Sequence, residues 1–105
     1  MARERKSEAD LRDLFNKLVQ PKLDVGLYTP LVRSWRWPPA TVKMPAGTKS
    51  TMFQIVEKET GYVVAHCHAY VLPNGAIGAS GKLDPKEVRD GSTTYVLAPP
   101  TAKKT

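Results

Sequence analysis

The sequence offers little covalent reinforcement, because its 105 residues include a single cysteine and no disulfide can form within the chain. No apolar run approaches the roughly 20 residues that a membrane helix requires. The first ten residues, MARERKSEAD, lack the apolar segment of a secretory signal. Acidic residues are missing over a long stretch, since none lies between positions 25 and 56. These absences predict a cytoplasmic protein without a membrane segment.

Positive charge is in excess, with 16 lysines and arginines against 10 aspartates and glutamates and a net charge of +6. A basic surplus favours polyanionic partners such as nucleic acid. The cations of the acid-free stretch have no compensating charge nearby in the sequence. The predicted contact surface for RNA or DNA consists of Arg33, Trp35, Arg36, Lys43, Lys49 and Lys82.

Both tryptophans lie in the segment 33–39, RSWRWPP. Aromatic rings can stack on unpaired bases, and guanidinium groups bind phosphates. In the competing interpretation, Trp35 and Trp37 share one face of a short strand and close the core, while Arg33 and Arg36 point to water. A small protein has few large side chains for its core, which favours this second interpretation.

An N-terminal helix is the most clearly patterned element. Ser7, followed three residues later by Asp10, is a helix-capping pattern. Apolar residues then repeat at helical spacing along one face: Leu11, Leu14, Phe15, Leu18 and Val19. Pro21 is expected to end this helix. Four prolines then interrupt residues 22–49, which predicts an irregular connection with one short strand.

Strand patterns dominate from residue 50 onward. TMFQIVE (51–57) and YVVAHCHAYVL (62–72) are β-branched and aromatic runs joined by a turn at Gly61. Pro73-Asn74-Gly75-Ala76 predicts a two-residue type I′ turn, with Leu72 opposite Ile77 and Tyr70 opposite Ala79. Asp84-Pro85-Lys86-Glu87 has the pattern of a helix start, which predicts a short helix ending near Gly91. TTYVLA (93–98) is the last expected strand.

These elements predict an α+β fold in which the N-terminal helix packs on an antiparallel sheet of about four strands, with a short helix before the last strand. A single domain is expected over residues 7–98. Residues 1–6 and 99–105 are expected to be flexible basic tails.

Alternation along the central strand separates two faces. One face is small and apolar and is expected to contact the helix, which makes Cys67 a buried, unreactive thiol. The other face carries His66 and His68 side by side. A metal site would need further ligands, and with Cys67 on the opposite face only acids such as Glu57 or Asp84 remain, so neither a metal nor a cofactor is expected. The histidine pair could act as general acid and base, although a packed, hydrogen-bonded role is favoured.

The run GAIGASGK (75–82) does not satisfy the phosphate-loop signature, because five residues separate Gly75 from Gly81 and Leu83 follows Lys82. Within residues 60–91, the chain instead shows His-x-Tyr, a Pro-Asn-Gly turn, Ile-Gly-Ala-Ser-Gly and Asp-Pro-Lys. This pattern resembles short uncharacterised bacterial or phage-borne proteins. No activity comes with the resemblance. It implies one constellation: His68, Tyr70, Ser80, Gly81, Asp84 and Lys86.

Three functional hypotheses follow. The favoured one is a small basic module that binds nucleic acid, and RNA in particular. The second is a metal-independent, toxin-like RNase in which His66 and His68 act as acid and base while Lys82 or Arg36 stabilises the phosphate charge. The third is a protein-interaction or structural module that contacts a protein partner or a second copy through a sheet edge or through the face that carries the tyrosines and histidines.

Overall fold

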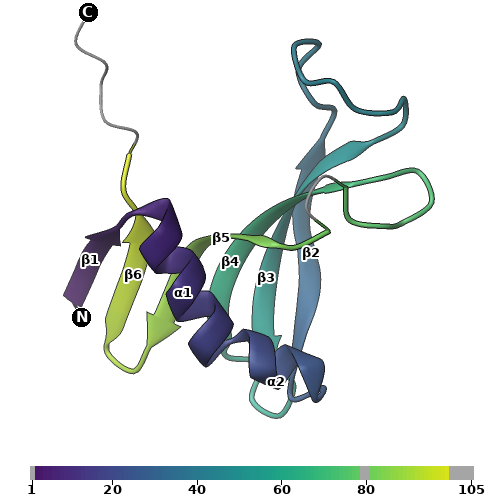
Figure 1. Ribbon diagram of the computed structural model, residues 1–105. Coiled ribbons are helices and arrows are strands. Elements are labelled where there is room, and N and C mark those ends of the chain that lie inside the picture. Colours follow the sequence, from purple (N-terminus) through teal and green to yellow (C-terminus); the bar gives the residue numbers. More distant parts are fainter. Residues whose placement is uncertain (1, 79–80, 100–105) are drawn as a thin grey trace, which may run out of the picture.

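The computed structural model describes residues 2–78 and 81–99. It contains one mixed sheet of six strands in the order β1-β6-β5-β4-β3-β2, in which β1 is parallel to β6 and all other neighbours are antiparallel. The chain order is β1 (Ala2–Lys6), α1 (Glu8–Leu18), α2 (Gln20–Asp24), β2 (Tyr28–Arg36), β3 (Lys49–Glu57), β4 (Val63–Val71), β5 (Asp84–Asp90) and β6 (Thr93–Leu97) (Figure 1).

The predicted sheet of about four antiparallel strands with a short second helix is therefore wrong. Residues 2–6, expected to be flexible, form β1 beside β6. A nine-residue strand, β2, occupies much of the expected irregular connection. Pro30 is tolerated there because β2 is an edge strand, where one side of the backbone needs no ladder hydrogen bonds. The predicted type I′ register also fails, as described below.

The expected helix after residue 84 is replaced by β5, which pairs with β4 on one side and β6 on the other. Pro85, placed at the first turn of that helix by the sequence pattern, instead sits next to a register shift in the ladder, a position that proline can occupy in a sheet. Pro85 and Val88 are buried. Burial in the core and pairing with two strands outweigh a local capping pattern.

The N-terminal helix is confirmed. The backbone N–H of Asp10 donates to Ser7 Oγ over 3.1 Å, which is the expected cap. Leu11, Phe15 and Val19 are buried against the sheet, where they meet a core that includes Cys67, itself buried as predicted. The pKa of the Cys67 thiol is raised to about 12, mainly because burial disfavours the thiolate. Pro21 does not end helical structure altogether, because it lies in the first turn of α2.

Removing the cap should measurably weaken α1. Ser7→Ala deprives the Asp10 N–H of its acceptor, and we expect the free energy of unfolding to fall by about 1 kcal/mol. Urea denaturation followed by circular dichroism measures this loss. Ser7→Asp, which restores an acceptor at the same position, should recover most of the stability. Equal stability of the alanine variant and the wild type would show that the cap contributes nothing.

The turn after β4 has a different geometry from the predicted one. Val71, rather than Leu72, lies opposite Ile77. The Gly75 N–H donates to the Leu72 carbonyl, and Gly75 has a φ of +88°. This is a three-residue loop in which a turn is followed by a left-handed residue. The predicted type I′ turn would have paired Pro73 with Ala76, and proline has no backbone N–H to donate to that pair. The expected Tyr70–Ala79 pairing lies outside the described residues.

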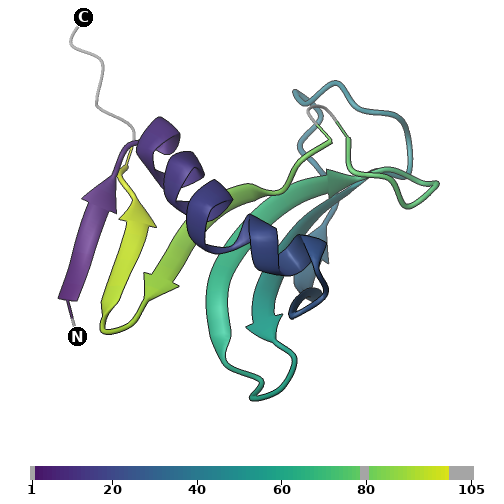
Figure 2. The same ribbon diagram turned by 60° about the horizontal axis from the view of Figure 1, so that its bottom comes forward.

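Both helices lie on the same face of the sheet, and no helix of the described chain covers the other face (Figure 2). On the covered face of β4, Ala65, Cys67 and Ala69 are buried, whereas His66, His68 and Tyr70 on the opposite face are half-buried. Neither described helix has the length and apolar character needed to cross a membrane. The helix-free face is therefore the broad surface on which side chains of several strands remain accessible.

Candidate functional site

A pocket of about 690 Å³ opens on the helix-free face. It spans β2 to β5 and is partly walled by Pro39 and Val42 of the loop between β2 and β3. Side chains from four strands meet there although they lie far apart in the sequence. Those central to the chemistry are Arg36, Ser50, Met52, His68, Tyr70 and Lys86.

Two β-bulges flank this pocket. In β2, Val32 pairs with Phe53 but Ser34 pairs with Met52, which leaves Arg33 as an extra residue. In β5, Glu87 pairs with His66 but Pro85 pairs with Cys67, which leaves Lys86 as an extra residue. A bulge shifts the alternation of side chains by one position, and bulges often redirect a side chain at functional sites. Each bulge here occurs at a basic residue.

The bulge in β2 aligns two arginines. Val32 shares the helix-covered face with its partner Phe53, so alternation turns Arg33 to the helix-free face. Beyond the bulge, Arg36 pairs with Ser50 on that same face. In a regular strand the two arginines, three positions apart, would point to opposite faces. Both are exposed, and among the described residues neither has a carboxylate within ion-pair distance.

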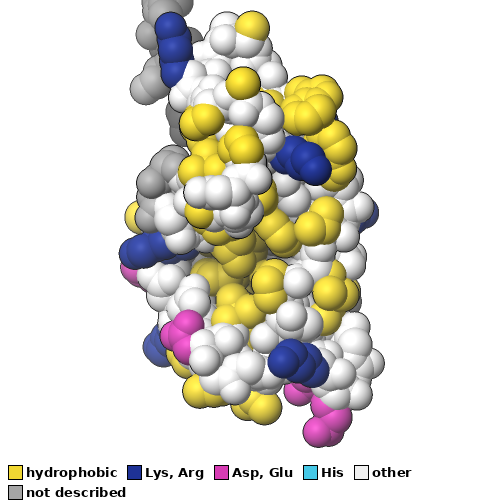
Figure 3. Space-filling model, turned by 90° about the vertical axis from the view of Figure 1, so that its right-hand side faces the viewer, with side chains coloured by type: hydrophobic (Ala, Val, Ile, Leu, Met, Phe, Trp, Pro, Cys, Tyr) yellow, Lys and Arg dark blue, Asp and Glu magenta, His cyan; other side chains and the backbone are white. Residues whose placement is uncertain are grey.

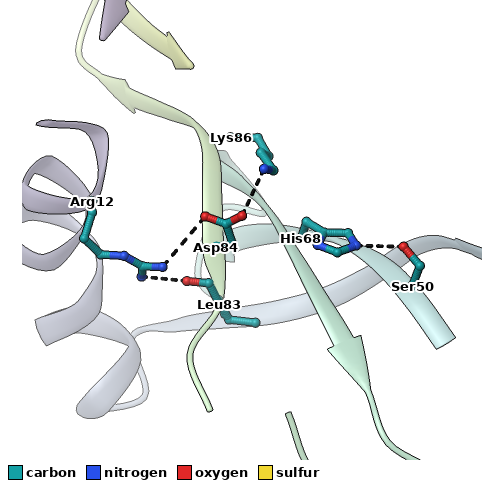
Figure 4. Close-up of polar contacts among 6 residues, drawn as sticks. All are labelled: Arg12, Ser50, His68, Leu83, Asp84 and Lys86. Carbon is teal, nitrogen blue, oxygen red and sulfur yellow. Dashed lines mark hydrogen bonds and ion pairs between the residues drawn. The ribbon is translucent and has the colours of Figure 1, made fainter. Parts of the chain in front are cut away.

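Lys86 differs because its charge is partly compensated. Its Nζ lies 2.9 Å from one carboxylate oxygen of Asp84, and the other oxygen lies 3.8 Å from Nη2 of Arg12 on α1 (Figure 4). Arg12 also donates from Nη1 to the Leu83 carbonyl oxygen over 2.6 Å. Asp84 thus forms ion pairs with Arg12 on the helix side and with Lys86 on the pocket side. The uncompensated charge at the pocket comes mainly from β2.

His68 lies between these charges. A hydrogen bond of 2.7 Å joins its Nε2 to Ser50 Oγ on β3 (Figure 4). The Tyr70 ring meets the His68 ring edge-on, with centroids 4.8 Å apart. Burial lowers the pKa of His68, and the positive charges of Lys86 and Arg36 lower it further, against an opposing effect of Asp84. The lowered pKa favours the neutral imidazole, which is hydrogen-bonded to Ser50 and in contact with Tyr70.

His66 is largely shielded from solvent, with its side chain 17% exposed. Its Nδ1 lies 3.8 Å from Oε2 of Glu87, which also accepts a hydrogen bond of 2.9 Å from Nε of Arg89. Its Nε2 is buried, with no hydrogen-bond partner among the described residues. Burial lowers the pKa of His66; Glu87 opposes this effect, and Arg89 and Arg33 add to it. Acid–base catalysis by this histidine stays a prediction.

We expect the two histidines to make the folded protein less stable in mild acid. Their pKa values are lowered in the folded chain from an ordinary 6.5, so below that pH the unfolded chain binds more protons than the folded one. Their stabilising contribution is complete above pH 6.5 and is lost as the pH falls from 6.5 toward the lowered values. We expect the urea midpoint to fall between pH 7.5 and pH 5.

A double variant isolates this effect from that of the carboxylates. His66→Gln/His68→Gln cannot titrate, so its urea midpoint should vary less over the same pH range than that of the wild type. If the variant and the wild type lost stability equally on acidification, the histidines would not be the cause.

The tryptophans do not close the core, so this part of the interpretation is wrong, although Arg33 and Arg36 are exposed as it predicted. Trp35 is 45% exposed and Trp37 is 61% exposed. Their rings meet edge-on at 4.8 Å, and Lys49 Nζ lies 4.5 Å from the centre of the Trp35 ring. In the view onto the β2 side, hydrophobic side chains form a broad band, with visible acidic side chains confined to the lower half (Figure 3). The tryptophan pair thus belongs to an exposed, locally basic edge.

The structure brings together part of the predicted contact surface. Arg33, Arg36 and Trp35 lie at or beside the pocket, and Lys43 is exposed in the loop that contributes a pocket wall. Lys82 lies elsewhere, in a smaller pocket of about 270 Å³ that it shares with Glu8, Arg12 and His68. This arrangement does not place all of these cations around one phosphate.

Four members of the predicted constellation line the main pocket, namely His68, Tyr70, Asp84 and Lys86. Gly81 lines a different pocket with Lys82, and Ser80 lies outside the described residues. Sequence reasoning missed Ser50 and Met52, which β3 places opposite Tyr70 and His68. Alternation from the predicted β3–β4 hairpin could have found them, given the correct register.

The described residues contain no cluster of three or more histidine, cysteine or acidic side chains arranged to hold a metal ion. No family model, curated protein or solved structure matches the chain.

Proposed function

We propose that this protein binds nucleic acid through the helix-free face of its sheet. The observation that carries the proposal is that a bulge aligns Arg33 and Arg36 on this face, beside a pocket lined by Tyr70 and Lys86. In the described chain neither arginine has a carboxylate within ion-pair distance. Uncompensated arginines gain most from a phosphate, because no internal ion pair has to be broken.

The surroundings of the pocket support the same class of ligand. The acid-free sequence from 25 to 56 supplies β2, the following loop and most of β3. All charged side chains of these segments are therefore positive. Tyr70 adds a flat ring next to the cations of this face, whereas Trp35 pairs with buried Thr51 and turns to the other side of β2. Cations with interleaved aromatic rings suit a ligand made of phosphates and bases.

Salt-dependent binding tests the proposal. Fluorescence anisotropy of a labelled single-stranded RNA, titrated with the protein at 50 and 200 mM salt, should show affinity that falls as salt rises, because bound cations release counterions from the phosphates. The same samples run on a denaturing gel should contain intact RNA. Absence of binding at micromolar protein would contradict the proposal, and cleavage of the probe would favour the RNase hypothesis instead.

A further inference from the structure

The pocket is lined by apolar and aromatic side chains as well as by cations. A ligand bound only through its phosphates needs exposed cations, but here apolar and aromatic groups line a depression between them: Pro39, Val42, Met52 and Tyr70. Its volume of about 690 Å³ falls in the range of pockets that enclose a small organic group. The lining therefore suits a flat, partly apolar group next to a phosphate, which is the composition of a nucleotide.

Two loops stand together at one end of this face. Residues 37–48 and 72–78 both rise from the same end of the sheet (Figure 1). They are in close contact: a Cβ built on Gly78 would lie 2.7 Å from Met44 Cε, and one on Gly47 would lie 3.1 Å from Pro73 Cγ. The first loop also walls the pocket through Pro39 and Val42. A pocket wall at this end of the sheet leaves less room for a rigid duplex than for a flexible single strand.

The ring of Tyr70 is held in place on the pocket floor. It meets the His68 ring edge-on, and His68 is itself fixed by its hydrogen bond to Ser50. A ring with restricted motion offers a base a stacking surface with little further loss of side-chain entropy. Duplex bases are stacked on each other and present only their edges, so an unpaired base is the form that can use this surface.

We infer that the ligand is single-stranded nucleic acid and that one unpaired base enters this pocket and stacks on Tyr70 while Arg33 and Arg36 bind the flanking phosphates. This inference rests on the proposed function. It adds the form of the nucleic acid and a residue that distinguishes this form from a duplex.

The test compares a labelled 12-nucleotide RNA with the same strand annealed to its complement, at 100 mM salt. We expect the single strand to bind at least tenfold more tightly. Tyr70→Leu should weaken single-strand binding by about 5- to 150-fold, the range for loss of one stacked base, and should leave duplex binding unchanged. Tyr62→Leu is the matched control, because Tyr62 is 70% exposed and lies outside the pocket.

Tyr70→Phe distinguishes stacking from a structural effect. This variant keeps the ring, so its affinity should stay within about twofold of the wild type, and circular dichroism checks the fold of each variant. Equal affinity for single strand and duplex, or a Tyr70→Phe variant as weak as Tyr70→Leu, would overturn the inference. If Arg33→Ala/Arg36→Ala still lost affinity in that case, the proposed function would survive. Absence of binding to either RNA would overturn both.

Discussion

Phe15→Ala is expected to lower the free energy of unfolding by about 3–5 kcal/mol, the usual cost of truncating a buried phenylalanine. Phe15 is fully buried, between α1 and the sheet. The core has only one helix layer, so few neighbouring side chains can move to fill the cavity. Domains of this size are stable by about 5–15 kcal/mol, which means that the variant would lose a large part of its stability.

Urea denaturation followed by circular dichroism and tryptophan fluorescence measures this loss. Leu31→Ala is the control, because Leu31 lies on β2 and is 49% exposed. It should cost well under 1 kcal/mol. Equal losses in the two variants would contradict the assignment of the core to the face covered by α1.

The Arg33→Ala/Arg36→Ala variant is expected to bind single-stranded RNA about 25-fold more weakly than the wild type at 0.1 M salt, if each arginine neutralises one phosphate. The plot of log affinity against log salt should become less steep by about 1.4, because two fewer counterions are released. Both side chains are exposed and without an ion-pair partner in the described chain, so their removal should leave the urea midpoint almost unchanged.

A matched variant removes the same charge from elsewhere. Lys17→Ala/Lys58→Ala takes one cation from α1 and one from the turn between β3 and β4, both exposed. General electrostatic attraction predicts similar losses for the two double variants. A specific contact on the helix-free face predicts a much larger loss, and a larger change in salt dependence, for the arginine variant.

Local sequence patterns correctly predicted α1, the alternation of β4 and the turn between β3 and β4. The cap at Ser7 and the apolar repeat through Phe15 identified α1, and alternation in the central strand placed Cys67 in the core. The turn at Gly61 correctly joined β3 to β4. In each case the pattern extends over several residues, and its side chains pack where that pattern directs them.

Elements whose structure depends on distant partners were missed. β1 is a short, charged strand that exists because β6 offers an unpaired edge. β5 begins with a sequence typical of a helix start, yet it fills the space between β4 and β6. Proline in β2 argued against a strand, and only the position of β2 at the sheet edge makes Pro30 acceptable. None of these partners can be recognised from the segment itself.

The candidate site was predicted in part for the same reason. The helix-free face with His68 and Tyr70 followed from alternation, and the basic character of β2 followed from composition. The sequence did not predict that Arg36 and Lys86 line the same pocket, because their placement depends on the added strand β5 and on two bulges. A bulge has no reliable signature in a single sequence, although it decides on which face every later residue of the strand lies.

Binding of single-stranded nucleic acid to the helix-free face of the sheet can be tested residue by residue through chemical-shift mapping. ¹⁵N-labelled protein titrated with an unlabelled 12-nucleotide RNA should show its largest amide shifts at residues 33–36 of β2, 68–70 of β4 and 85–87 of β5. Amides of α1 at residues 13–17 should not move. Shifts concentrated on α1, or none on β2 and β4 at saturating RNA, would show that the RNA does not bind this face.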